Sequence, residues 1–203
     1  MKRFVTGVFI CFLALPFLFQ PASGCGENPV TAVPAGTETP APNPFVFRNG
    51  VIWGMNPQQI ALIENVPMEL RSTTEWSVMV TVSPVSVSRF SASLVYMFHQ
   101  NALRMITYEF QSNCSNLNFQ YLTGALCSVY GESREASPVA VKGWMDRINA
   151  DKYRLELIQQ VHEWTAEDGT HIYLFYYTSE NYAILYVCPE SAGGGTGYDT
   201  NGL

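Results

Sequence analysis

The middle of the chain alternates apolar and polar positions with a period of two. The alternation runs over residues 90–98, breaks at a short polar turn over 99–102, and returns over 106–110. A period of two places successive side chains on opposite faces of a sheet. The pattern therefore predicts a β-hairpin with one buried face, and the alternating valines within 78–82 predict a strand before it.

A second alternating region lies near the C-terminus and has three segments, 161–166, 171–177 and 182–188. The first two flank Asp168-Gly169, a dipeptide typical of tight hairpin turns because glycine tolerates positive φ. The polar residues 179–181 provide the next turn. The region predicts a three-stranded antiparallel meander.

Two further segments carry the start signals of helices. The first begins at Asn56, a favourable N-cap followed by Pro57 and Gln59, and it must end by Pro67. Another begins at Ser137-Pro138, and its apolar stripe comprises Val141, Trp144, Met145 and Ile148. The segment 152–160, which follows it, fits either a helix or a strand.

The segment 117–129 predicts an amphipathic helix. Its apolar positions recur at helical spacing, and they are Leu117, Tyr121, Leu122, Ala125 and Val129. Gly131 is suited to cap the helix, because a C-terminal cap often needs a backbone conformation that glycine adopts without strain. Separate runs of strands and helices indicate an α+β domain built on an antiparallel sheet.

The N-terminus has the layout of a secretory signal. Lys2 and Arg3 precede an apolar run over 4–19, which is shorter than the ~20 residues that a spanning helix needs. We therefore expect residues 1–24 to be a signal peptide that is removed on export.

Small residues precede a cysteine in the string Ala22-Ser23-Gly24-Cys25, which resembles a bacterial lipobox. The resemblance implies cleavage before Cys25 and attachment of two acyl chains, which suffice for stable anchoring. Ordinary signal-peptidase cleavage after Gly24, which leaves Cys25 an incidental thiol, is the alternative. The anchored protein is expected on the outer face of the cytoplasmic membrane of a Gram-positive bacterium.

Low-complexity segments flank the predicted domain. Residues 25–44 are rich in proline and threonine and almost lack large apolar side chains, so they predict an extended tether. Residues 191–203 are rich in glycine and predict a disordered tail. A single domain over 45–190 lies between them and is long enough to bury a core.

The chain is acidic, which narrows its partners. Loss of Lys2 and Arg3 with the signal leaves nine of the 11 basic residues, against 17 acidic residues. Such a charge repels the phosphates of nucleic acids. We therefore expect no nucleic-acid partner, and we predict contact with the membrane through the lipid anchor and with an envelope protein.

Three cysteines fall inside the predicted domain: Cys114, Cys127 and Cys188. The helix over 117–129 would hold Cys114 and Cys127 about 18 Å apart, far beyond the reach of a disulfide. We expect a disulfide between Cys114 and Cys188, with three free thiols in a reducing niche as the alternative. The cysteines and histidines lack metal-ligand spacing, so no metal site is predicted.

Several short strings resemble a group of poorly characterised secreted proteins and lipoproteins of Firmicutes. They are Phe47-Arg48, Ile52-Trp53-Gly54-Met55 with Ile60, Tyr130-Gly131, Trp164 and Asp168-Gly169-Thr170. The Gly-Met and helix element also resembles the β-lactamase-inhibitor-protein-like fold, which the small lipoprotein of the outer-membrane barrel-assembly machine shares. These resemblances imply helices packed on one face of an antiparallel sheet, and they imply no activity.

Catalytic signatures are sparse. The sequence has no nucleophile elbow, phosphate loop or dinucleotide fingerprint, so it predicts no cofactor. Cys127 together with His99 or His162 leaves one alternative function, a cell-envelope hydrolase with a thiol–imidazole site.

Tyrosines are the remaining candidates for function. The strands over 171–177 and 182–188 are apolar or aromatic on both faces, so one face covers the core and the other needs a helix, a partner or a ligand. Burial under the helix that begins at Ser137 is the competing interpretation. We predict a non-catalytic binding module that meets its partner through Tyr176 and Tyr182, because tyrosines are enriched in binding hot spots.

Overall fold

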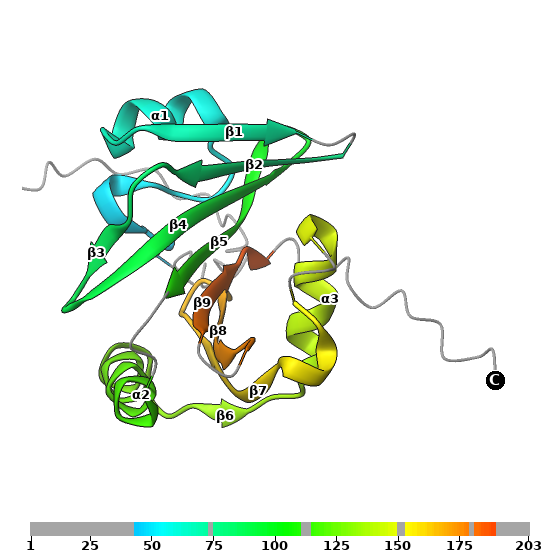
Figure 1. Cartoon of the computed structure of the whole chain (residues 1–203). Helices are drawn as coiled ribbons and strands as arrows, with labels where there is room; N and C mark the ends of the chain where they lie inside the picture. Colours follow the sequence, from blue (N-terminus) through cyan, green and yellow to red (C-terminus); the bar gives the residue numbers. More distant parts are fainter. Residues whose placement is uncertain (1–42, 73–74, 111–114, 150–152, 179–180, 190–203) are drawn as a thin grey trace, which may run out of the picture. The chain divides into compact units, whose positions relative to one another are not determined.

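The computed structural model describes residues 43–72, 75–110, 115–149, 153–178 and 181–189 (Figure 1). The chain separates into two units, Met1–Thr39 and Pro40–Leu203, and every described residue belongs to the second unit. The predicted signal, Cys25, nearly all of the predicted tether and the predicted tail lie outside the described residues, as does Cys114.

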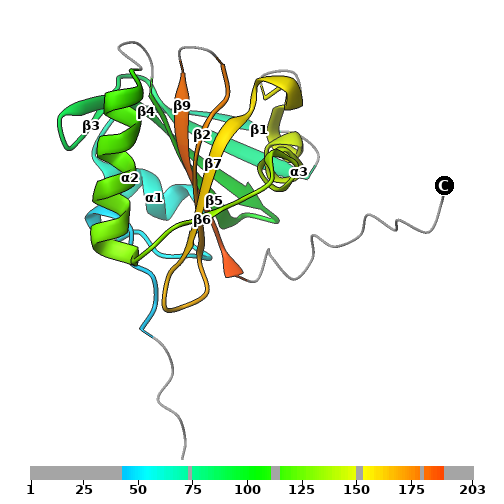
Figure 2. The same cartoon turned by 90° about the horizontal axis from the view of Figure 1, so that it is seen from below.

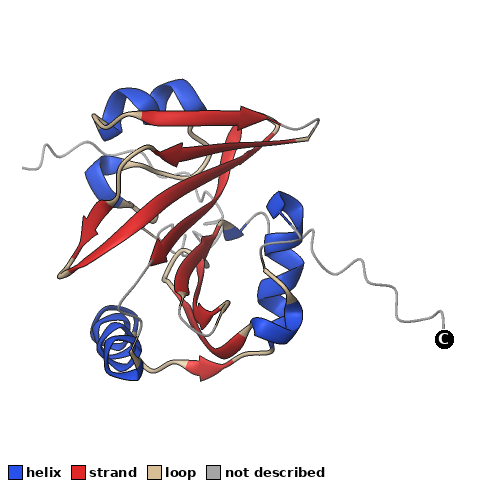
Figure 3. Cartoon of the chain, viewed as in Figure 1, coloured by secondary structure: helices blue, strands red, loops and turns tan. Residues whose placement is uncertain are grey.

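Strands account for much of the described chain (Figure 3). They are β1 (Met68–Ser72), β2 (Trp76–Thr81), β3 (Val85–Val87), β4 (Phe90–His99), β5 (Ala102–Phe110), β6 (Arg134–Glu135), β7 (Gln159–Thr165), β8 (His171–Tyr176) and β9 (Tyr182–Val187). All pairings between these described strands are antiparallel. The predicted α+β class with an antiparallel sheet is confirmed.

The sheet joins the predicted hairpin to the predicted meander. Its order is β1-β2-β4-β5-β9-β8-β7-β6, and β3 pairs with β4 off this path. The junction is the pair β5–β9, in which Phe110 lies opposite Tyr182 and Met105 lies opposite Val187. A five-stranded half (β1 to β5) and a four-stranded half (β6 to β9) therefore meet through the last strand of each.

The helices are α1 (Pro57–Glu64), α2 (Asn116–Tyr130) and α3 (Pro138–Asn149), with short 3-10 helices η1 (Arg48–Gly50) and η2 (Leu155–Leu157). The Asn56 side chain accepts from the backbone N–H of Gln59, and the Gln59 side chain accepts from the backbone N–H of Asn56, so the predicted capping box is confirmed. Gly131 caps α2 with φ of 84°, and its N–H donates to the carbonyl of Cys127.

Strands β8 and β9 are apolar on both faces, and helices cover each of these faces. On β9, Tyr182, Ile184 and Tyr186 belong to the cluster with α1 and α2. The alternate residues Ala183, Leu185 and Val187 pack in the cluster that contains Val141, Trp144 and Met145 of α3. Figure 2 shows α2 and α3 on opposite sides of these strands. The implied placement of all helices on one face is corrected: α1 and α2 share a face, and α3 covers the other.

The sequence pattern did not predict three of the strands. β1, β3 and β6 are short or polar, so their alternation is too brief to register. The ambiguous segment 152–160 contains η2 and the start of β7, so it forms neither a long helix nor one strand.

Candidate functional site

Helix α2 turns a different face to the core from the one that the sequence pattern predicts. Its buried residues are Phe119, Leu122 and Leu126, with exposed fractions of 2%, 3% and 7%. Of the five positions in the predicted apolar stripe, only Leu122 is buried. The inward set is also spaced by three and four residues, so periodicity alone cannot choose between the two faces.

The outward face of α2 carries a row of exposed apolar residues and no charge. Leu117, Tyr121 and Val129 expose 75%, 42% and 70% of their surface, and Ala125 between them is also exposed. None of the 15 residues of α2 carries a charge. Apolar residues on both faces of an uncharged helix make this surface a candidate for contact with a partner. We refer to Leu117, Tyr121, Ala125 and Val129 as the α2 stripe.

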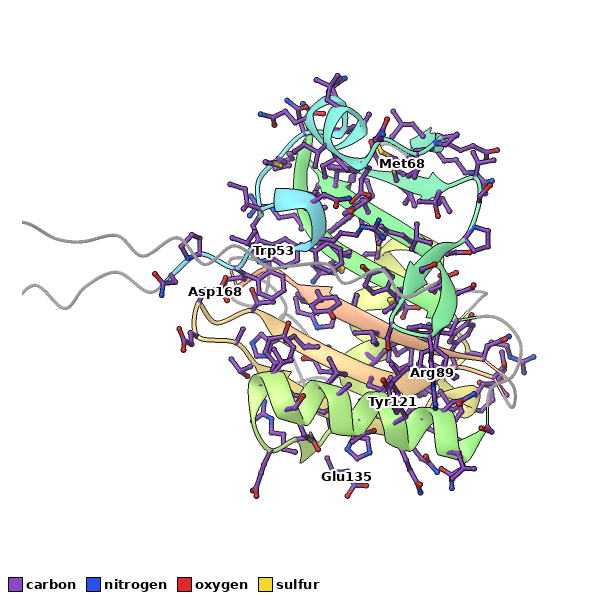
Figure 4. All side chains as sticks on the ribbon, turned by 90° about the vertical axis from the view of Figure 1, so that its left-hand side faces the viewer. Trp53, Met68, Arg89, Tyr121, Glu135 and Asp168 are labelled. Carbon is purple, nitrogen blue, oxygen red and sulfur yellow. The ribbon has the colours of Figure 1, made fainter. Side chains whose placement is uncertain are left out.

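An arginine borders the α2 stripe at its N-terminal half. The Arg89 guanidinium lies 4.1 Å from the ring centroid of Tyr121 and 5.1 Å from that of Phe90. It also donates to Oδ1 of Asn118 at 3.2 Å, and the Ser88 and Tyr121 hydroxyls lie 3.2 Å apart. These contacts hold the Tyr121 ring in place and keep Arg89 beside the stripe (Figure 4). Arginine and tyrosine are the residue types that most often dominate binding energy.

The two tyrosines predicted to bind a partner lie beneath α2. Tyr182 is 1% exposed, and its ring lies 4.8 Å from Phe110 and 6.3 Å from Phe119. Tyr176 is partly buried and stacks on Phe119 at 4.4 Å. This placement contradicts the predicted open face. Helix α2 covers the tyrosines because Phe119 packs on both of their rings, whereas the helix from Ser137 packs on the opposite side of the sheet.

Cys188 is a buried free thiol, so the predicted disulfide with Cys114 is not supported. Its backbone N–H donates to the carbonyl of Arg104, near the start of β5. Phe110, the last described residue before Cys114, ends the same strand at its other end. The thiol instead lies 3.9 Å from Nη1 of Arg104.

The histidines do not converge on the half-buried Cys127. Among the described residues, no histidine hydrogen-bonds to its thiol. His99 packs on the ring of Trp76 at 5.0 Å. Nδ1 of His162 instead lies 3.1 Å from Oγ of Ser133, a pairing that the sequence did not suggest. No acidic group is hydrogen-bonded to His162 in the described part of the chain, so the third member of a catalytic triad is missing from this pair.

The residues that carry the family resemblance gather at one end of the domain. Trp53 Nε1 donates to Oγ1 of Thr170 at 2.8 Å, and Phe45 stacks on Trp53 at 5.8 Å. The Asp168 carboxylate accepts from the backbone N–H groups of Phe45 and Thr170, and it also accepts from the Thr170 hydroxyl. Figure 4 shows Trp53 and Asp168 together.

We call the hydrogen bonds that join Phe45 and Trp53 to Asp168 and Thr170 the clasp, because they fasten the start of the domain to the turn before β8. Tyr130, at the C-terminal end of α2, has its hydroxyl pKa raised by burial and by the charge of Asp168. Trp164 Nε1 donates to the carbonyl of Gly131. Asp168 thus fixes Phe45, where the chain enters the domain, to the turn before β8.

A second polar cluster fastens the edge strand β6. Arg134 donates through Nε to Oε2 of Glu163 at 2.9 Å, and its Nη2 lies 2.9 Å from Oε1. Nδ1 of His171 lies 2.9 Å from the same Oε1. Burial raises the pKa of the Glu163 carboxyl, but hydrogen bonds from Arg134 and His171 lower it further, so the net pKa is below the ordinary value. The carboxylate is therefore ionised and paired, which suits a structural ion pair.

Metal-binding clusters and membrane-spanning helices are absent from the described residues. No group of three or more histidine, cysteine, aspartate or glutamate side chains there is arranged to hold a metal ion. Within the same part of the chain, no helix is long and apolar enough to cross a membrane.

Comparison with family models, with curated proteins and with solved structures found no match. The resemblances to Firmicutes lipoproteins and to the β-lactamase-inhibitor-protein-like fold therefore stay predictions. The α2 stripe and its arginine are the candidate functional site.

Proposed function

We propose that the protein is a non-catalytic, extracytoplasmic binding module that is lipid-anchored through Cys25 and presents the α2 stripe to a protein partner. The signal-like N-terminus, the lipobox-like string and the proline-rich segment over 25–44 support export and tethering. Because Tyr182 is buried, we assign partner binding to the exposed outer face of α2 and not to Tyr182.

One observation carries the proposal: exposed apolar side chains stand on a helix that has no charge. An exposed leucine, tyrosine and valine on one stripe lose apolar contact with water when a partner covers them. The stacked Arg89 adds a charge-assisted donor at the rim whose ordering is already largely established in the free protein. An apolar protein surface complements this arrangement.

Leu117→Glu is expected to abolish capture of the partner while the domain stays folded. The glutamate places a charge within the apolar contact, where coverage by the partner would remove it from water. Leu62→Glu is the matched control, because Leu62 is an 85% exposed leucine on α1, remote in sequence from the α2 stripe. The measurement is capture of envelope proteins by each purified variant, with circular dichroism to verify folding. Equal capture by both variants would contradict the proposed surface.

Cys25→Ala is expected to shift the protein from the membrane fraction to the culture medium. The substitution removes the thiol to which acyl chains attach, and the apolar run over 4–19 leaves with the signal. Fractionation of expressing cells with an antibody to the domain measures the shift. Retention of the variant on the membrane would mean that a lipid on Cys25 is not the anchor.

A further inference from the structure

The α2 stripe has a spacing that suits contact with its own copy. Leu117, Tyr121, Ala125 and Val129 are four residues apart and symmetric about Thr123. We propose that a second copy of this chain occupies the stripe, in a two-fold symmetric contact between antiparallel α2 helices. The inference rests on the proposed function, and it names the partner.

Side-chain size supports the pairing. A two-fold axis that passes between Tyr121 and Ala125, at the level of Thr123 but on the other side of the helix from it, sets Leu117 against the partner's Val129. The same axis sets Tyr121 against the partner's Ala125, so the largest exposed side chain of the stripe meets the smallest. A two-fold contact requires such self-complementarity, because each patch is its own partner.

The helix also permits close approach at the axis. A Cβ added at Gly124 would meet no atom within 4 Å, so the surface above this glycine is open. Positions four apart form the ridges that interdigitate when two helices cross at about −50°. The Tyr121 ring, which Arg89 and Phe90 hold in place, has room over the small residues of the facing helix.

Charge favours this face over the rest of the surface. The exported chain carries 17 acidic residues against nine basic ones, so two copies repel each other over most orientations. Helix α2 contributes no charge to the contact. Arg89, the charged group that borders the stripe, has no carboxylate partner among the described residues and is positive.

The contact is expected to be weak. A 15-residue helix is about 22 Å long, so a contact confined to its outer face buries far less than the ~800 Å² per partner of a standard interface. Such an area suits a reversible dimer with a dissociation constant in the micromolar range or weaker.

A charge-exchange experiment tests the pairing. The secreted chain with Cys25→Ala is studied by sedimentation velocity over a concentration series, in the presence of a reducing agent. Leu117→Glu and Val129→Lys are each expected to weaken self-association about tenfold or more, because each introduces a charge opposite an apolar residue. An equimolar mixture of the two variants is expected to restore association. In the mixed dimer the new glutamate faces the new lysine, and the remaining leucine faces the remaining valine.

The controls separate this inference from the proposed function. Leu62→Glu carries the same added charge on α1 and is expected to self-associate like the unmodified chain. A chain that stays monomeric at millimolar concentration overturns the dimer, as does a mixture that fails to restore association. If α2 variants of such a monomer still lose capture of an envelope protein, the binding function stands and only the identity of its partner is wrong. If neither association nor capture depends on α2, both proposals fail.

Discussion

Glu64→Ala is expected to lower the free energy of unfolding by about 3–4 kcal/mol. The Glu64 side chain has no exposed surface, and its Oε2 lies 3.3 Å from Nε of Arg48. Asn49 donates to the same oxygen at 3.2 Å, and the Tyr96 hydroxyl donates to Oε1. Burial, followed by the hydrogen bond to Glu64, raises the pKa of Tyr96 well above its usual value, so the hydroxyl stays protonated and keeps donating.

The alanine variant leaves the Asn49 and Tyr96 donors without their acceptor and Arg48 without its counter-charge. Tyr96 has no surface exposure, so its hydroxyl cannot regain water, whereas Arg48 is about a quarter exposed and is rehydrated in part. This partial relief places the expected loss near the lower end for a broken buried ion pair. The arginine Nε forms no directed hydrogen bond, so the contact with Glu64 acts mainly through charge.

Urea denaturation measures the loss. Glu69→Ala is the matched control, since Glu69 pairs with Arg71 on an exposed edge strand and its removal should cost no more than about 0.5 kcal/mol. Tyr96→Phe completes a double-mutant cycle that isolates the bond between Tyr96 and Glu64. A Glu64→Ala variant as stable as Glu69→Ala would show that the cluster does not support the fold.

The elements that the sequence predicted correctly depend on residues that are close together in the chain. The α1 cap depends on residues three positions apart, and the hairpin β4–β5 depends on alternation and a nearby turn. The junction between β5 and β9 and the contact between Arg48 and Glu64 join residues distant in sequence, and no local pattern marks them. The clasp of Trp53 on Thr170 is of the same kind.

Helix α2 shows why the candidate site was harder to predict than the helix. The helix itself follows from spacing and from Gly131, and its existence and its cap were confirmed. A charged outer face normally identifies the inner one, but α2 has none. The choice between Leu117 and Phe119 as inward residues therefore depended on the aromatic residues of β5, β8 and β9, which only the assembled sheet brings beneath Phe119.

Tyr182→Ala is expected to lower the free energy of unfolding by about 3–5 kcal/mol, as truncation of buried aromatic residues does. Tyr182 is 1% exposed and stacks on Phe110 across the junction of the two sheet halves. Truncation leaves a cavity under α2, between Phe110 and Phe119, that the surrounding strands cannot close.

Tyr121→Ala is expected to have a small effect on stability and a large effect on association, the reverse of Tyr182→Ala. Its ring is 42% exposed and contacts Arg89 and Phe90, so its loss should cost only about 1 kcal/mol of stability yet weaken association through the α2 stripe. Thermal or urea unfolding measures the first quantity, and sedimentation measures the second. The two tyrosines thus separate support of the fold from recognition. If Tyr182→Ala proved nearly as stable as the unmodified chain and Tyr121→Ala unfolded it, the assignment of the inner and outer faces of α2 would be reversed.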